Sequence, residues 1–120
     1  MDDKLYSSLE KNKLQLNQYF DNSADYFFKP VKIFNINCAV VMCEDLTDSM
    51  KLWEVFLKPL NGLRGDKSPQ EVYQYIKNET TIPFNPSCVE TFSDSMFFLT
   101  AGFGLLFIDG INQAFVYLHH

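Results

Sequence analysis

The stretch TAGFGLLFIDG, residues 100–110, decides the class of fold. It contains most of a run without charge, residues 96–108, that is shorter than the about 20 residues a membrane-spanning helix needs. Gly102 and Gly104 divide this run into the end of an apolar helix and a buried strand, and Asp109-Gly110 turns the chain back. A helix that stops on glycine and leads into a core strand is typical of a soluble α/β domain.

The composition is that of a protein with a substantial hydrophobic core. Hydrophobic residues make up 47% and aromatic residues 16% of the 120 residues, far from the composition of disordered chains. A chain of this length is expected to fold as one unit. We therefore predict a single domain over residues 1–120.

The charge balance argues against two classes of partner. The chain has 10 basic and 15 acidic residues, a net charge of −5, and its basic residues do not cluster in the sequence. Nucleic-acid-binding proteins need a basic face, and anionic membrane surfaces attract basic segments. We expect this domain to bind neither nucleic acid nor an anionic membrane surface by charge.

The cysteine and histidine content argues against catalysis. Cys38, Cys43 and Cys88 are odd in number, which favours reduced thiols in an intracellular compartment. The polar start of the chain lacks a signal-peptide pattern, and no segment is long enough to span a membrane. A cysteine nucleophile needs a base, and the only histidines are His119 and His120. We expect no enzymatic activity, no cofactor and no metal ion.

Four segments have the apolar spacing of helices: residues 4–20, 46–60, 69–78 and 92–101. The third begins with a strong start signal, in which Ser68 is the N-cap, Pro69 is the first helical residue and Glu71 closes a capping box. Gly102 is expected to end the fourth helix.

Four further segments have the pattern of strands: residues 26–34, 38–43, 104–108 and 113–118. Pro30 favours an edge position for the first, and the continuous apolar run of the second favours burial on both faces. Residues 79–90 are expected to be mostly loop, although Ser87 and Glu90 could form a capping box. The predicted fold is α/β with α+β character, a four-stranded mixed sheet packed with helices in the order α-β-β-α-α-α-β-β.

Four carboxylates are the candidates for a ligand or coupling site. Glu44, Asp45 and Asp48 follow a buried strand, at the kind of sheet edge where open α/β folds bind ligands, and Asp109 follows another strand. Oxygen ligands suit a hard cation. The alternative is that Asp45 and Asp48 cap the next helix and favour its positive end.

Three consecutive aromatic residues are the candidates for an interaction surface. Side chains alternate along a strand, so Tyr26, Phe27 and Phe28 cannot all face one core. Exposed aromatic surface on this edge strand would contact another domain or subunit, including a second copy of the chain. The alternative is simple burial.

Four segments carry a family resemblance: the helix that ends in residues 22–25, the apolar strand and acidic turn of residues 38–44, the helix of residues 46–60, and residues 102–115. In their order and spacing they resemble the N-terminal soluble domain of the A subunit of spore germination receptors, the GerA family. The chain departs from the family pattern at residues 44–46, where an Asp-Gly pair is common, and in the glycine-bearing loop 61–66.

The resemblance implies a domain of a larger receptor. Members continue into membrane-embedded segments and work with B and C subunits in the inner membrane of the dormant spore, which places this domain on the cytoplasmic side. The resemblance implies a non-enzymatic module that couples nutrient sensing to its partners or assembles with them. The alternatives are a sensor domain that binds the germinant itself and a stand-alone αβ regulatory domain.

Overall fold

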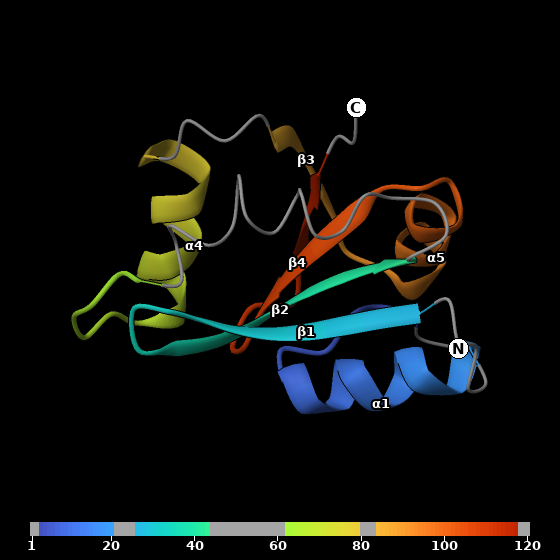
Figure 1. Cartoon of the computed structure of the whole chain (residues 1–120), viewed down its shortest axis with the longest axis horizontal. Helices are drawn as coiled ribbons and strands as arrows, with labels where there is room; N and C mark the ends of the chain where they lie inside the picture. The colour runs from blue at the N-terminus through green and yellow to red at the C-terminus, as the bar shows by residue number, and fades with distance from the viewer. Residues whose placement is uncertain (1–2, 21–25, 44–61, 80–83, 118–120) are drawn as a thin grey trace.

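The computed structural model of the chain describes residues 3–20, 26–43, 62–79 and 84–117, and these carry one sheet and three helices (Figure 1). The sheet has five strands in the order β1-β2-β4-β5-β3, and every neighbouring pair is antiparallel. The elements are α1 (Leu9–Phe20), β1 (Tyr26–Ile33), β2 (Ile36–Cys43), α4 (Pro69–Glu79), β3 (Phe84–Val89), α5 (Phe92–Thr100), β4 (Gly104–Ile108) and β5 (Ala114–Tyr117). The architecture is α+β.

The prediction of a four-stranded mixed sheet in the order α-β-β-α-α-α-β-β is wrong. The additional strand is β3, which was expected to be mostly loop because of its proline, and it pairs antiparallel with β5. Pro86 fits there because β3 is an edge strand and its register shifts between Asn85 and Cys88, at a bulge that needs no ladder donor. The predicted helix over residues 46–60 lies outside the described residues.

Both predicted hairpins are confirmed. Strands β1 and β2 pair up to Ile33 and Ile36, so Phe34 and Asn35 form a two-residue turn. Strands β4 and β5 pair from Gly104 opposite Tyr117 inward. The edge position expected from Pro30 is confirmed as well, because β1 pairs only with β2 in the described sheet.

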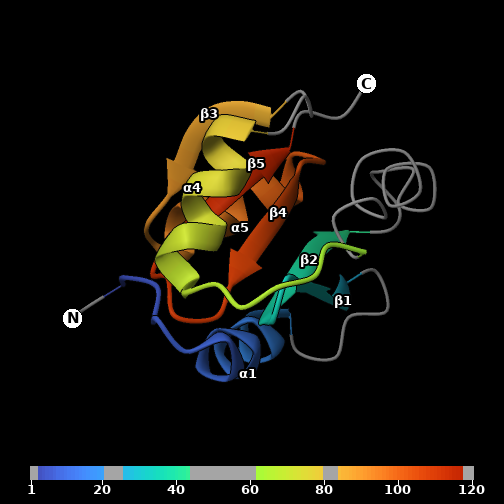
Figure 2. The same ribbon diagram turned by 90° about the vertical axis from the view of Figure 1, so that its left-hand side faces the viewer.

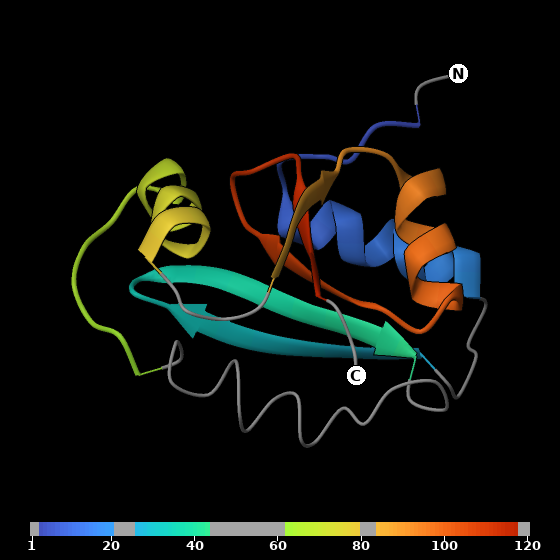
Figure 3. The same cartoon turned by 90° about the horizontal axis from the view of Figure 1, so that it is seen from above.

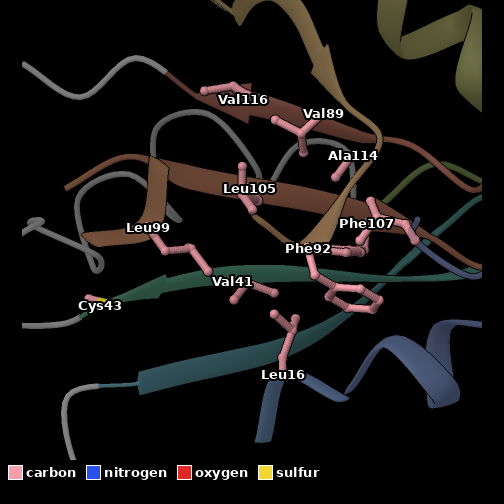
Figure 4. Packing of buried hydrophobic residues seen from close by; sticks show 11 residues of the cluster. Leu16, Val41, Cys43, Val89, Phe92, Leu99, Leu105, Phe107, Ala114 and Val116 are labelled. Carbon is pink, nitrogen blue, oxygen red and sulfur yellow. The ribbon is translucent and has the colours of Figure 1, made fainter. Parts of the chain in front are cut away.

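The central strands divide the core into two layers because their side chains alternate between the faces of the sheet. On one face, α4 contributes Val72 and Ile76 to a buried cluster with Val40 and Leu106. On the other face, α1 and α5 pack on a second cluster (Figure 4), whose labelled members are Leu16, Val41, Cys43, Val89, Phe92, Leu99, Leu105, Phe107, Ala114 and Val116. Figure 2 shows α4 in front of the strands and α5 behind them.

The helix ends follow local hydrogen-bonding rules at α4 and α5. Glu71 Oε1 accepts from the Ser68 N–H at 2.9 Å and Ser68 Oγ accepts from the Glu71 N–H at 3.2 Å, which confirms the capping box. Helix α5 is capped by Thr91, whose Oγ1 accepts from Asp94 N–H at 3.1 Å, so the alternative capping box at residues 87–90 is wrong. Gly102 follows α5 with φ 96°, a conformation that favours glycine.

The first helix starts later than predicted, at Leu9 rather than at residue 4. The buried Asn12 side chain holds the preceding segment extended, accepting from Tyr6 N–H at 2.9 Å and donating to the Tyr6 carbonyl at 2.8 Å. Leu5 N–H also donates to the Glu90 carbonyl at 2.9 Å. Across the described ranges, no helix is both long and apolar enough to span a membrane.

Leu16 and Leu14 offer a matched test of the second core layer. Leu16 is fully buried, whereas Leu14 on the same helix is 57% exposed. We expect Leu16→Ala to lower the free energy of unfolding by about 2–5 kcal/mol, because it removes buried methyl groups and leaves a cavity. Leu14→Ala should change it by about 0.5 kcal/mol or less. Urea unfolding followed by circular dichroism measures both, and equal losses would contradict this packing.

Candidate functional site

Asp109 lies in the turn after β4 and joins three parts of the chain. Its Oδ1 accepts a hydrogen bond from Leu9 N–H, at the start of α1, at 2.9 Å. Its own N–H donates to the Asn37 carbonyl at the start of β2, also at 2.9 Å. A carboxylate at the positive end of a helix is stabilising. The structure therefore gives Asp109 a structural task, the capping of α1.

The other predicted carboxylates, Glu44, Asp45 and Asp48, lie outside the described residues. Asp109 lies at the Cys38 end of β2, since Cys38 pairs with Ile108. Residue 44 follows Cys43, at the opposite end of that strand. Along a strand the five steps from Cys38 to Cys43 span about 17 Å. Within the described ranges no group of three His, Cys, Asp or Glu side chains could hold a metal ion.

The aromatic residues of β1 divide between the two faces of the sheet, as the alternation requires. Phe27 packs against the cluster under α4, and Phe28 packs against the cluster under α1 and α5. Both are half-buried, and Lys13 Nζ lies 5.5 Å from the centre of the Phe28 ring. Tyr26 lies in β1, but its side chain is outside the described part. An interaction surface at these three residues remains a prediction.

The most exposed large apolar side chain in the described ranges lies elsewhere, on α5. Phe97 is 65% exposed, and its ring contacts Phe98, which in turn contacts Phe103. Leu14 and Tyr19 on α1 are 57% and 47% exposed on the same side of the sheet, which Figure 3 shows covered by both helices. Sequence reasoning missed this surface, although two apolar residues at adjacent helical positions, Phe97 and Phe98, cannot both face one core.

A polar network connects α4 to the outer strands. The Tyr73 hydroxyl donates to Gln113 Oε1 at 2.9 Å, and Gln113 Nε2 donates to Glu90 Oε1 at 2.9 Å. Burial raises the pKa of Tyr73 to about 12, and the Cys88 thiol 3.6 Å away adds to the rise. The phenol is therefore protonated at neutral pH, as a hydrogen-bond donor requires.

The Cys38 thiol is equally unsuited to nucleophilic chemistry. It is buried in the core, and burial raises its pKa to about 12. The thiolate, not the thiol, is the nucleophile, so this side chain is inert near neutral pH. In the described part of the chain the thiols and the tyrosine network hold the fold together and do not form a nucleophile–base pair.

The comparisons with known proteins point to one family. The family model described as Bacillus/Clostridium GerA spore germination protein matches residues 14–119. A solved structure, the N-terminal domain of the A subunit of the Bacillus megaterium spore germinant receptor GerK3, superposes with a TM-score of 0.73 at 24% sequence identity. The match covers 95% of this chain and 47% of that one, so the chain spans about half the length of the solved domain. No curated protein matches the chain.

Asp109→Ala tests the structural task of this carboxylate. We expect the substitution to lower the free energy of unfolding by about 1 kcal/mol, the usual cost of removing a helix cap. Asp109→Asn keeps an oxygen acceptor for Leu9 N–H and should cost only a few tenths of that amount. Chemical denaturation of the three proteins measures both effects. An unchanged stability of Asp109→Ala would mean that the carboxylate does not support α1 and is available to a ligand.

Proposed function

The chain belongs to the GerA family of Bacillus and Clostridium spore germination proteins, and we propose that it forms part of the N-terminal domain of a germinant-receptor A subunit. The observation that carries this proposal is the family match over residues 14–119, joined with the fold shared with a solved A-subunit domain. In this proposal the domain is non-enzymatic. It transmits or assembles the nutrient-sensing complex through contacts with the other receptor subunits.

The distribution of polar groups supports a binding role rather than catalysis. Asp109 holds the start of α1, and Tyr73, Gln113 and Glu90 bond to one another. These groups serve the fold. The side chains left for a partner are the apolar ones on the face covered by α1 and α5, namely Leu14, Tyr19 and Phe97. Exposed apolar side chains of this size are typical anchors of protein–protein contacts.

The proposal extends to the location of the whole protein. We infer that the full-length protein continues into membrane-embedded segments in the spore inner membrane, with this domain soluble on the cytoplasmic side, as the family resemblance implies. The B and C receptor subunits are the proposed partners, and self-association is an additional arrangement that the same apolar face would allow. A ligand or coupling role for Glu44, Asp45, Asp48 and Asp109 is retained as part of this proposal.

Titration of the domain against the soluble regions of B and C partner subunits tests the proposal. We expect saturable binding to at least one of them in isothermal titration calorimetry. Phe97→Ala should weaken that binding about tenfold, because truncating a central aromatic anchor costs more than about 1 kcal/mol. Lys77→Ala, in the last turn of α4 on the other face, is the control and should leave the affinity unchanged.

Absence of binding to every partner region would contradict the coupling role. Sedimentation equilibrium of the domain alone separates self-association from partner binding. A dimer that Phe97→Ala dissociates would assign the α1–α5 face to a second copy of the chain instead of a B or C subunit.

A further inference from the structure

A hollow of about 420 Å³ lies at the end of the molecule where the β1–β2 hairpin turns. Its walls come from two segments distant in the sequence, the hairpin turn and the loop that leads into α4. Figures 1 and 3 show the two at the same end of the molecule. The lining residues are Lys32, Phe34, Asn35, Gly62, Leu63, Arg64, Gly65 and Asp66. The volume lies within the range of sites for small molecules.

Direct contacts hold the two walls together. Asn35 Oδ1 accepts a hydrogen bond from Lys67 N–H at 2.6 Å, which connects the turn to the loop. The Phe34 ring meets Tyr75 of α4 edge-on, with centroids 5.1 Å apart. Leu63 and Phe34 also pack against the cluster under α4. The hollow is therefore built on the core and is formed before any ligand binds.

Phe34 has a backbone conformation that needs an explanation. Its φ is 55°, in the left-handed region that two-residue hairpins usually fill with Asn or Gly. A phenylalanine there is strained, and such strain is found where the surroundings or a function require it. Here the strain sets the aromatic ring in the wall of the hollow, between Tyr75 and the Lys67 ammonium group, whose Nζ is 5.5 Å from the ring centroid.

The charges around the hollow are mostly positive, against the net charge of −5 of the chain. Lys32 comes from the end of β1 and Arg64 from the facing loop, so the two cations line the hollow from different segments. Lys67 adds a third cation at the Phe34 ring. Asp66 is the single acidic residue in the lining. An arginine guanidinium pairs with carboxylate or phosphate oxygens through two parallel hydrogen bonds.

The loop backbone is also open to a ligand on this side. Gly62 and Gly65 carry no side chain to cover their peptide groups. Gly65 has φ 129°, which other residues rarely adopt, and a Cβ placed there would only touch the Phe34 ring at 3.8 Å. The glycine is therefore required by the backbone shape of the loop and not by crowding. Exposed backbone N–H groups beside cations are suited to anions.

We propose that this hollow is a binding site for a small oxyanion, a carboxylate or phosphate group carried by a low-molecular-mass ligand. Arg64 is the principal partner of the oxyanion, Lys32 is the second cation, and Phe34 is the apolar wall against which the rest of the ligand packs. Asp66 weakens binding through repulsion and so favours ligands that also carry a positive group. The site does not depend on the partner subunits and is separate from the α1–α5 face.

The test uses the whole chain with succinate and inorganic phosphate as two separate probes, titrated at low ionic strength and followed by two-dimensional NMR of the labelled protein. We expect saturable shifts of the residue 34–35 and 62–67 amides with at least one probe. Arg64→Gln should weaken that binding about tenfold through loss of the bidentate pair. Asp66→Asn should strengthen it several-fold by removing the repelling carboxylate.

Lys11→Gln is the matched control, because Lys11 is an exposed lysine on α1, where its Nζ lies 5.8 Å from the Tyr6 ring. It should leave the affinity unchanged. Equal weakening by Lys11→Gln would show unspecific attraction to positive charge and overturn the proposal. So would the absence of saturation with both probes up to about 10 mM, a concentration at which even a weak specific site fills. The gain expected for Asp66→Asn cannot arise from a folding defect.

Discussion

Burial of β2 and β4 on both faces is the constraint on which the rest of the structure depends. From Cys38 to Cys43 and from Gly104 to Ile108 every residue is buried, so neither face of the sheet can be left to water. The side chains alternate, and each face needs its own cover. Helices α1 and α5 supply it on one side and α4 on the other. The two-layer arrangement then follows from the hydrophobic effect acting on two adjacent apolar strands.

Local signals in the sequence predicted the elements that local hydrogen bonds form. The Ser68–Glu71 capping box, the stop at Gly102 and both hairpins rest on contacts between near neighbours, and all are present. The late start of α1 depends on Asn12, whose side chain bonds to the backbone of Tyr6. Strand β3 depends on pairing with β5, which overrides the loop signal of Pro86. The order of strands likewise follows from pairings between distant segments, which no local pattern encodes.

The candidate sites were harder to predict for the same reason. Asp109 stood out as an acidic residue after a strand, but its partner, Leu9, lies 100 positions earlier in the chain. The hollow at the hairpin turn joins Lys32 to Arg64, which are also distant in the sequence. The even spacing of basic residues along the chain concealed their grouping in space. The exposed Phe97 was hidden within an apolar run that reads as core.

The fold thus presents two separate surfaces: an apolar one over α1 and α5, and a basic hollow at the turn between β1 and β2. Both depend on the sheet as a rigid frame, which is the central claim. Native-state hydrogen exchange measured by NMR tests this claim most directly. We expect the β2 and β4 amides to exchange only through global unfolding, and the β1 and β3 amides to exchange faster through local opening. If β2 and β4 amides exchanged as fast as those of the edge strands, the doubly covered centre could not be what holds the fold together.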